Sequence, residues 1–163
     1  MAKPHENPIS IEDLRKVLEY FPETGEFKWN VPRLGKKPKS FGSLCTNGYL
    51  LTRINYKKYL LHRLAWAYVY GYWPEQLDHI NRDRADNRIS NLREATRSQN
   101  LANRTVRARS GFKGVVLLKG GRFRAAITVN RKFKSLGLFN TAKEAHACYV
   151  ANAKKEFGEF ACP

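Results

Sequence analysis

Cysteine, acidic residues and long apolar runs are all scarce in this sequence of 163 residues. The three cysteines, Cys45, Cys148 and Cys162, lie far apart and are odd in number, so they fit neither a disulfide framework nor a Cys-x-x-Cys zinc site. We therefore expect reduced thiols in a cytoplasmic protein and no structural zinc.

The sequence also lacks an apolar run long enough to span a membrane. The N-terminal residues contain no apolar segment of the secretory type, and the apolar stretch 59–72 is interrupted by His62 and Arg63. We expect no membrane partner, and the stretch 59–72 predicts a buried helix. Hydrophobic residues make up 42% of the chain, which is enough for a packed core.

Positive charge is the dominant feature of the composition. Thirty Lys and Arg residues stand against fourteen Asp and Glu, a formal net charge of +16. Such an excess favours a polyanionic partner, either nucleic acid or an anionic membrane surface. The basic residues are spread over several predicted elements and not over one amphipathic helix, which favours nucleic acid.

The first part of the chain predicts a mixture of helices and short strands. Ser10 and Asp13 form a capping-box pattern that predicts a helix over residues 10–21. The basic segment 33–40 is expected to be an exposed loop able to lie along a phosphate backbone. Alternation and turn residues predict the other elements: a strand at 27–29, a hairpin of 49–54 and 58–61, a helix at 62–70 ending at Gly71, and strands at 77–80 and 91–95.

The second part predicts a small module of strands and one helix. Thr96 and Gln99 form a capping box that predicts a helix, and the basic segment 103–110 that follows it predicts a domain boundary between residues 105 and 106. Beyond this boundary we expect a three-stranded antiparallel sheet packed on a capped helix, with strands at 111–118, 122–129 and 132–138 and a helix over 141–157.

Chemistry-bearing residues are concentrated in residues 77–104. Asp78 and His79 are adjacent at a predicted strand end, and Asn100 lies in the first turn of the helix opened by Thr96. A neutral imidazole can accept a proton from water near pH 7. Carboxylate and amide oxygens are hard ligands suited to Mg²⁺ or Mn²⁺. If the strands fold back on the helix, these groups can hydrolyse a phosphodiester with one metal ion.

Each of these residues has a simpler explanation when it is taken alone. A single Asp or Asn is usually a turn or cap residue, and a single His is usually a structural one. Only the combination favours a nuclease. His62 is expected to have a structural role at a helix start. For Arg63, contact with a phosphate and internal pairing remain open alternatives.

The spacing of this block resembles the HNH, or ββα-metal, motif of phage homing endonucleases. The resemblance covers residues of about 45 to 105, with a motif core at 59–104. It is carried by Leu-Asp-His-Ile at 77–80, Asn-Arg-Ile-Ser-Asn-Leu at 87–92, Thr-Arg-Ser-Gln-Asn at 96–100 and the His-Arg-Leu-Ala-Trp segment at 62–66. It implies that His79 is the general base, that Asp78 and Asn100 bind one divalent ion, preferably Mg²⁺, and that Asn87 and Asn91 support the loop.

Residues 110–161 resemble the APETALA2/ethylene-response-factor DNA-binding domain. The matching residues are Ser-Gly-Phe-Lys-Gly-Val at 110–115, Phe123, Ala125 and Ile127, Leu-Gly-x-Phe-x-Thr-Ala-x-Glu-Ala at 136–145, and Phe-Gly-Glu at 157–159. The resemblance implies a sheet that enters the DNA major groove. Alternation in the second strand places Arg122 and Arg124 opposite its apolar face. The expected DNA contacts are Lys113, Arg122, Arg124, Thr128, Lys132 and Ser135.

The sequence therefore predicts an α+β protein with an HNH endonuclease domain at 1–105 and an APETALA2-like domain at 106–163. The expected activity is cleavage of double-stranded DNA by a phage- or mobile-element-encoded enzyme in a bacterial host, with a homodimer left open. Deletion of residues 106–163 is expected to weaken binding and leave the chemistry detectable. The alternatives are a DNA-binding regulator with a decayed nuclease core and an RNA-binding protein.

Overall fold

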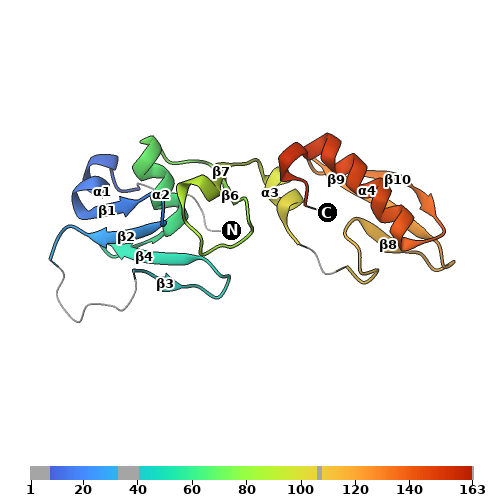
Figure 1. Ribbon diagram of the computed structural model, residues 1–163, viewed down its shortest axis with the longest axis horizontal. Helices are drawn as coiled ribbons and strands as arrows, with labels where there is room; N and C mark the ends of the chain where they lie inside the picture. Colours follow the sequence, from blue (N-terminus) through green and yellow to red (C-terminus); the bar gives the residue numbers. More distant parts are fainter. Residues whose placement is uncertain (1–7, 33–40, 106–107, 163) are drawn as a thin grey trace. The chain divides into compact units, whose positions relative to one another are not determined.

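The protein divides into two compact units. The computed structural model describes residues 8–32, 41–105 and 108–162. Its contacts separate Met1–Glu94 from Ala95–Pro163, which we call the N-terminal unit and the C-terminal unit (Figure 1). This division lies before the boundary predicted between residues 105 and 106. The helix opened by Thr96 therefore belongs to the C-terminal unit and not to the N-terminal one. The basic loop predicted at 33–40 lies outside the described residues.

The N-terminal unit combines helices with small antiparallel sheets. Strand β1 pairs with β2, β4 lies between β3 and β5, and β6 pairs with β7. In chain order the elements are α1 (Ile11–Val17), β1 (Leu18–Phe21), β2 (Glu26–Trp29), β3 (Ser43–Leu44), β4 (Leu50–Ile54), β5 (Lys57–Leu60), α2 (Leu61–Tyr70), β6 (Leu77–His79), the 3-10 turn η1 (Ile89–Asn91) and β7 (Leu92–Glu94).

The helix predicted over residues 10–21 is shorter than expected. It begins after Ser10, whose side chain accepts a hydrogen bond from the Asp13 N–H, but it ends at Val17. Residues 18–21 pair with β2 instead, with Leu18 opposite Trp29. Leu18 and Tyr20 are buried, because alternate residues of a strand share one face. Strand pairing therefore replaces the last turn of the predicted helix.

The predicted hairpin and the helix after it are confirmed. Asn55 and Tyr56 join β4 to β5 with φ values of 48° and 63°, as a two-residue turn with the twist of a hairpin requires. Helix α2 ends at Gly71, which adopts the left-handed conformation with φ of 77°. Leu64, Ala65 and other buried residues of α2 form the centre of the core of this unit.

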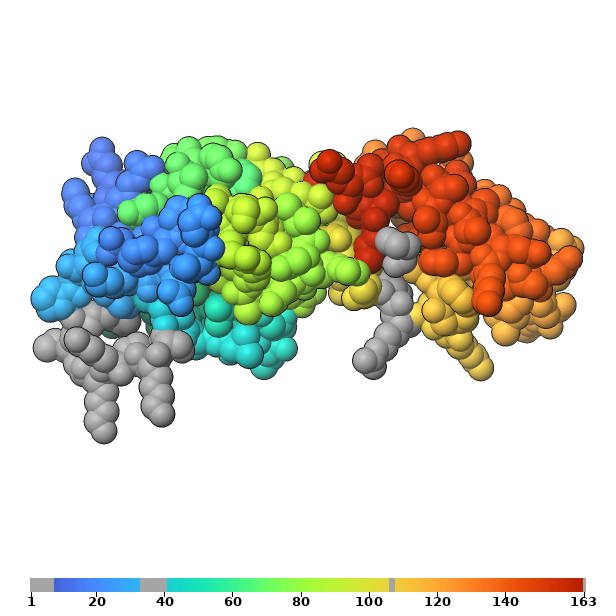
Figure 2. All heavy atoms as spheres, in the orientation of Figure 1, coloured from blue at the N-terminus to red at the C-terminus, as the bar shows by residue number. Residues whose placement is uncertain are grey.

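The C-terminal unit has the predicted sheet and helix. Strand β9 lies between β8 and β10, and both pairs are antiparallel. Atoms of α4 form much of the face of this unit that Figure 2 shows. The elements are α3 (Arg97–Asn103), β8 (Val115–Leu117), β9 (Phe123–Val129), β10 (Lys132–Phe139), α4 (Ala142–Phe157) and the 3-10 turn η2 (Gly158–Phe160).

Local signals specify both helices of this unit. The predicted capping boxes are present at Thr96 with Gln99 and at Thr141 with Glu144. The first predicted strand is shorter than expected and begins only at Val115. Gly114 precedes it with φ of 74°, and a Cβ atom there would lie 2.0 Å from the Tyr149 ring. Only glycine allows the chain to pass this close to α4.

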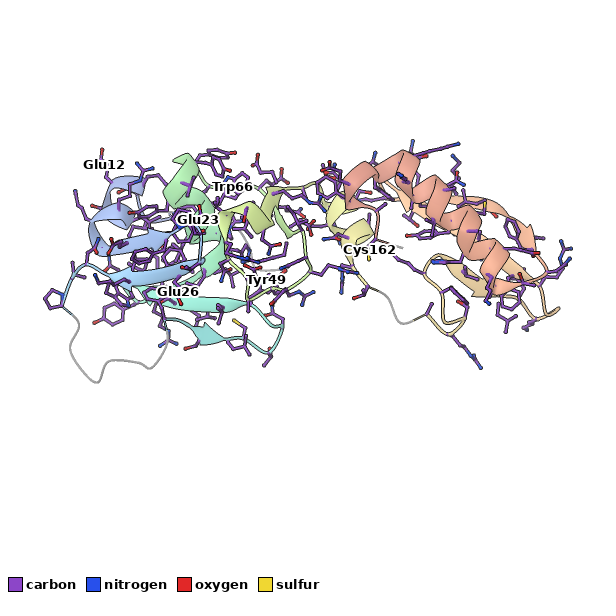
Figure 3. The ribbon with its side chains drawn as sticks, viewed as in Figure 1. Glu12, Glu23, Glu26, Tyr49, Trp66 and Cys162 are labelled. Atoms are coloured by element: carbon purple, nitrogen blue, oxygen red, sulfur yellow. The ribbon has the colours of Figure 1, made fainter. Side chains whose placement is uncertain are left out.

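Helix α3 is held by residues from the far end of the C-terminal unit. The Cys162 N–H donates to the Ala102 carbonyl oxygen at 3.2 Å, and Cys162 lies beside α3 in Figure 3. The Lys113 ammonium donates to the carbonyl oxygens of Ala102 and Cys162. Ala102 is buried against Ile127 and Tyr149. The helix that carries Asn100 is therefore packed into the C-terminal module, which the sequence did not indicate.

Candidate active site

Asp78 and His79 lie at the end of strand β6 and are both buried. The register places Asp78 opposite Arg93 and His79 opposite Leu92 of β7. Neighbours in a regular strand point to opposite faces. Here the strand ends at His79, whose carbonyl oxygen accepts a turn hydrogen bond from the Arg82 N–H at 2.9 Å. The two residues therefore meet the loop 80–88 at the place where the regular strand stops.

An arginine on the neighbouring strand fixes the Asp78 carboxylate. Arg93 Nε donates to Asp78 Oδ2 at 2.9 Å, and Arg93 Nη2 lies 2.8 Å from the same oxygen. The side chains of Arg93 and Asp78 are only 15% and 8% exposed, so water screens this ion pair less than it would a surface pair. Charge-assisted hydrogen bonds of this kind hold a carboxylate in a defined orientation.

The His79 ring belongs to a cluster of three rings, in which both histidines are buried and Tyr49 is half-buried. Its centroid lies 5.0 Å from the His62 ring and 5.8 Å from the Tyr49 ring, which is labelled in Figure 3. Burial lowers the pKa of His79 below its ordinary value, while the Asn87 side chain and the Asp78 carboxylate act in the opposite direction. At pH 7 the neutral imidazole, which can accept a proton, is therefore the main form.

His62 and Arg63 occupy the start of helix α2 and have internal partners. His62 packs against Tyr49 with a centroid distance of 5.0 Å. Burial, followed by the neighbouring His79, lowers the pKa of His62 well below its ordinary value. Arg63 Nη2 donates to the Pro74 carbonyl oxygen at 2.6 Å, and Nη1 to that of Glu75 at 3.3 Å. Of the two alternatives for Arg63, the structure shows internal pairing.

The amides of Asn87 and Asn91 bind backbone atoms of the loop 80–88. Asn87 Nδ2 donates to the Ala85 carbonyl oxygen at 2.9 Å. Asn91 Nδ2 donates to the Asp86 carbonyl oxygen at 2.9 Å, and its Oδ1 accepts from the Asn81 N–H at 3.0 Å. Both asparagines are buried, so these bonds fix the loop that adjoins His79.

Asn100, the third predicted site residue, lies in the other unit. It is the fourth residue of α3 and is half-buried, and its backbone N–H donates to the Thr96 carbonyl oxygen at 2.9 Å. Asp78 and His79 belong to the N-terminal unit. The structure therefore brings two of the three predicted residues together, and the participation of Asn100 in the same site stays a prediction.

The donor groups at these positions match the chemistry of a hard divalent cation. Among the described residues, no group of three or more His, Cys, Asp or Glu side chains could hold a metal ion. The predicted ligand set is of a different kind, because it combines one carboxylate with one amide oxygen. Mg²⁺ characteristically uses few protein oxygen ligands and keeps several waters, and carboxylate and amide oxygens are donors of the kind that it binds.

The six predicted DNA contacts are not all on one face of the C-terminal sheet. The register pairs Ser135 with Ala126, which places Ser135 on the face that carries Arg124 and Thr128. The Arg124 guanidinium lies 5.4 Å from the centroid of the exposed Phe133 ring. Lys132, in contrast, pairs with Val129, on the side that packs against α4.

Lys113 has an internal role that the sequence did not indicate, since its ammonium binds the carbonyl oxygens of Ala102 and Cys162. Arg122 is exposed just before β9. Whether these residues contact DNA stays a prediction for the whole set of Lys113, Arg122, Arg124, Thr128, Lys132 and Ser135.

Sequence reasoning missed three residues that support the site. The role of Arg93 as the partner of Asp78 could not be predicted, because it depends on the register between β6 and β7. Tyr49 comes from a distant hairpin and stacks on both histidines. Arg84 lies 5.0 Å from the Tyr49 ring centroid and donates to the Asn47 carbonyl oxygen at 2.6 Å. An arginine opposite an aspartate in a predicted strand pair was the one available signal.

Two comparisons with known proteins bear on the class of this site. Residues 59–102, which include all five predicted HNH positions, match the family described as HNH endonuclease. An uncharacterized HNH endonuclease of Acanthamoeba polyphaga mimivirus, L560, is 29% identical over 149 residues, which cover 90% of this chain and 71% of that protein. No solved structure matches the chain. The two matches support a nuclease of the HNH endonuclease family.

The viral relative also bears on the rest of the chain. A similarity that covers 90% of the chain cannot be confined to either compact unit. The matches do not identify the C-terminal unit as an APETALA2-type domain, and that resemblance stays a prediction. The relative comes from a virus of an amoeba, so a phage origin also stays a prediction. No helix in the described part of the chain is long and apolar enough to cross a membrane.

Proposed function

We propose that the protein is a metal-dependent endonuclease that hydrolyses phosphodiester bonds in double-stranded DNA. The observation that carries the proposal is the pair Asp78–His79 at the end of β6, inside the segment 59–102 that matches HNH endonucleases. The net charge of +16 supports a polyanionic substrate. The order β6, β7, α3 along the chain, two strands followed by a helix, supports the proposed ββα-metal motif.

His79 acts as the general base in this proposal. Its ring would take a proton from the attacking water, and its lowered pKa keeps the accepting form populated at pH 7. The rings of His62 and Tyr49 pack against the imidazole and limit its rotation. A base that is fixed before substrate arrives does not have to be ordered during the reaction.

Asp78 and Asn100 act as ligands of one divalent cation, Mg²⁺ by preference and Mn²⁺ as the alternative. When bound, such a cation would neutralise charge on the phosphate and on the leaving oxygen. The bonds from Arg93 hold the Asp78 carboxylate in one orientation. The bonds of Asn87 and Asn91 keep the adjoining loop in place. Both kinds of support preorganise the site before DNA binds.

The proposal predicts that removal of divalent metal abolishes cleavage. Supercoiled plasmid incubated with the full-length protein should give relaxed or linear product with Mg²⁺ or Mn²⁺ and none with EDTA. Excess Mg²⁺ added after EDTA should restore cleavage, because the ion binds reversibly through oxygen ligands. Gel electrophoresis of the plasmid is the measurement.

Two outcomes would contradict parts of the proposal. Cleavage that continues in EDTA at an unchanged rate would remove the metal from the mechanism. Binding of duplex DNA without cleavage under any metal condition would favour the alternative function, a DNA-binding regulator whose nuclease core is inactive. Preference for structured RNA over duplex DNA in a competition assay would favour the RNA-binding alternative.

A further inference from the structure

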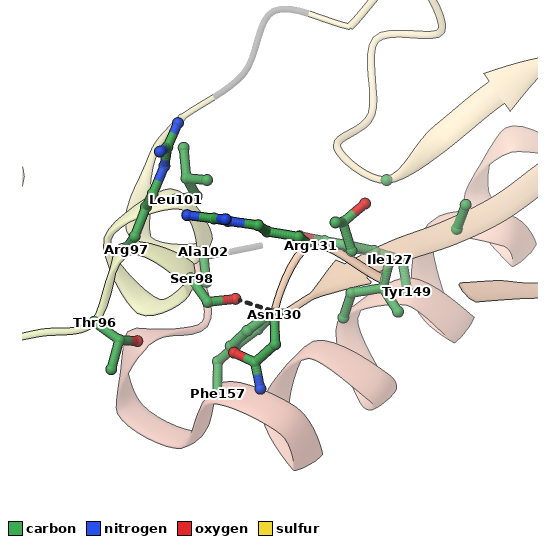
Figure 4. A pocket seen from close by; sticks show the side chains of 13 residues that line it. Thr96, Arg97, Ser98, Leu101, Ala102, Ile127, Asn130, Arg131, Tyr149 and Phe157 are labelled. Carbon is green, nitrogen blue, oxygen red and sulfur yellow. Dashed lines mark hydrogen bonds between the residues drawn. The ribbon is translucent and has the colours of Figure 1, made fainter. Parts of the chain in front are cut away.

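The C-terminal unit contains a groove between helix α3 and the β9–β10 hairpin (Figure 4). Its volume is about 750 Å³. Its inner part is apolar and includes Ile127, Tyr149 and Phe157, all of them buried. Its outer part is polar and basic, with Thr96, Arg97, Ser98, Thr128, Asn130 and Arg131. None of the residues that line it is acidic.

The two walls of this groove are joined by a hydrogen bond. The Asn130 N–H at the hairpin turn donates to Ser98 Oγ at 3.2 Å, shown as a dashed line in Figure 4. Below it, Ala102 of α3 packs in one cluster with Ile127 and Tyr149. These contacts therefore hold the two walls of the groove together. They also fix the backbone positions from which its two arginine side chains extend.

Arg97 and Arg131 line this groove from its two walls. Arg97 is the first residue of α3, and Arg131 is the second residue of the two-residue turn between β9 and β10. In the view of Figure 4 the Arg131 side chain extends toward helix α3, which carries Arg97 and Leu101. Neither arginine forms an ion pair in the described part of the chain, and both are exposed. Two guanidinium groups that line one groove repel each other, and an anion bound between them offsets this repulsion.

We propose that Arg97 and Arg131 together bind a phosphate of the DNA backbone. The inference rests on the proposed function, because DNA is taken as the substrate. A planar guanidinium can donate two parallel N–H bonds to a phosphate, and two guanidinium groups can hold it from two sides. Ser98, whose hydroxyl group can donate a further hydrogen bond, also lines this groove. Leu101 offers apolar surface for an adjoining sugar.

This proposed phosphate site shares helix α3 with Asn100, the proposed metal ligand. Arg97 lies three residues before Asn100 on α3, a spacing that places the two residues on neighbouring positions of one helix face. Arg131 lies in the module that holds α3. DNA bound by the arginine pair is thereby positioned with respect to the helix that carries the proposed metal ligand.

The test measures DNA binding by the full-length protein in EDTA, so that cleavage has no part in the result. Fluorescence anisotropy with a labelled duplex would be recorded over a range of salt concentrations for Arg97→Ala, Arg131→Ala and the double variant. We expect the double variant to bind roughly tenfold more weakly, with a log–log salt slope smaller by about one, as the loss of one phosphate contact predicts. Each single variant should show most of that loss, because both residues hold one phosphate.

A Lys154→Ala/Lys155→Ala variant provides the matched control. These lysines are exposed on α4 in the same unit and carry the same total charge as the arginine pair. Their loss should leave the affinity within about twofold and the salt slope unchanged. Equal losses in the two double variants would overturn the proposal, because the effect would then come from net charge. Tighter binding of the normal protein to duplex RNA of the same sequence would also overturn it.

The plasmid cleavage assay, run with Mg²⁺ on the same variants, separates this proposal from the nuclease assignment. An arginine-dependent salt slope in a protein that never cleaves DNA would support the phosphate site and count against the proposed function. Metal-dependent cleavage by a double arginine variant that binds DNA with normal affinity would support the proposed function and count against the phosphate site.

Discussion

Replacement of His79 by alanine is expected to slow metal-dependent cleavage of DNA by about 10²- to 10⁴-fold, the usual contribution of a positioned general base. The imidazole lies at the end of β6, and burial keeps it mainly neutral at pH 7. The second histidine of the same unit, His62, has its ring centroid 5.0 Å from that of His79. Single-turnover cleavage with saturating enzyme measures the chemical step without the effect on binding.

A His62→Phe variant is the control, because it retains an aromatic ring beside Tyr49 and His79. We expect its rate to stay within about tenfold of normal, since packing of the ring and not proton transfer is its role. A larger loss of cleavage rate in His62→Phe than in His79→Ala would indicate that His62 is the general base. An unchanged rate in His79→Ala would remove the base assignment altogether.

Deletion of residues 106–163 is expected to reduce cleavage by roughly a hundredfold or more, because loss of support for a metal ligand has effects of this order. The sequence alone predicted that chemistry would remain detectable after this deletion. The structure changes that expectation, because α3 depends on the deleted residues. Lys113 and Cys162 bind its backbone, and Ala102 packs against Tyr149.

Helix α3 cannot be expected to keep its structure without this packing. It has seven residues, and isolated helices shorter than about 12–15 residues are marginal in water. Loss of the helix would release Asn100. The three tryptophans, Trp29, Trp66 and Trp73, all lie in the N-terminal unit, so their fluorescence reports whether that unit stays folded after the deletion.

The Arg97→Ala/Arg131→Ala variant is the control for the deletion. It weakens binding but keeps α3 in place, so its cleavage rate should recover at high enzyme concentration. The deleted protein should not recover, although its tryptophan fluorescence remains that of a folded unit. Full recovery of the deleted protein at high concentration would show that the nuclease site is independent of the C-terminal module.

Local sequence signals predicted the elements that depend on neighbouring residues. The capping boxes at Thr96 and Thr141 and the stop at Gly71 were found, because each acts within one helical turn. The end of α1 was missed, because pairing of Leu18 with Trp29 outweighs the helical pattern there. The grouping of α3 with the C-terminal unit was missed for the same reason, since Ala102 meets Cys162 only in the folded chain.

In the candidate site too, the sequence predicted the residues that are neighbours in the chain and missed those that meet only in the folded protein. Asp78 and His79 were visible as neighbours at a strand end, and family resemblance gave them roles. Arg93 acquires its role only through the register of β6 with β7. The ring cluster of Tyr49 with the two histidines depends on a distant hairpin. Spacing in a sequence therefore indicates which groups can react, and tertiary contacts determine how they are held.

Single-turnover cleavage by Asp78→Ala, Asn100→Ala and the doubly substituted protein tests directly whether the two residues hold one cation. If they do, each single variant should lose most of the activity and the double variant should be no slower than the slower single variant, because residues that act as a unit give non-additive losses. Rate losses that multiply in the double variant, or a normal rate in Asn100→Ala, would contradict a shared metal site.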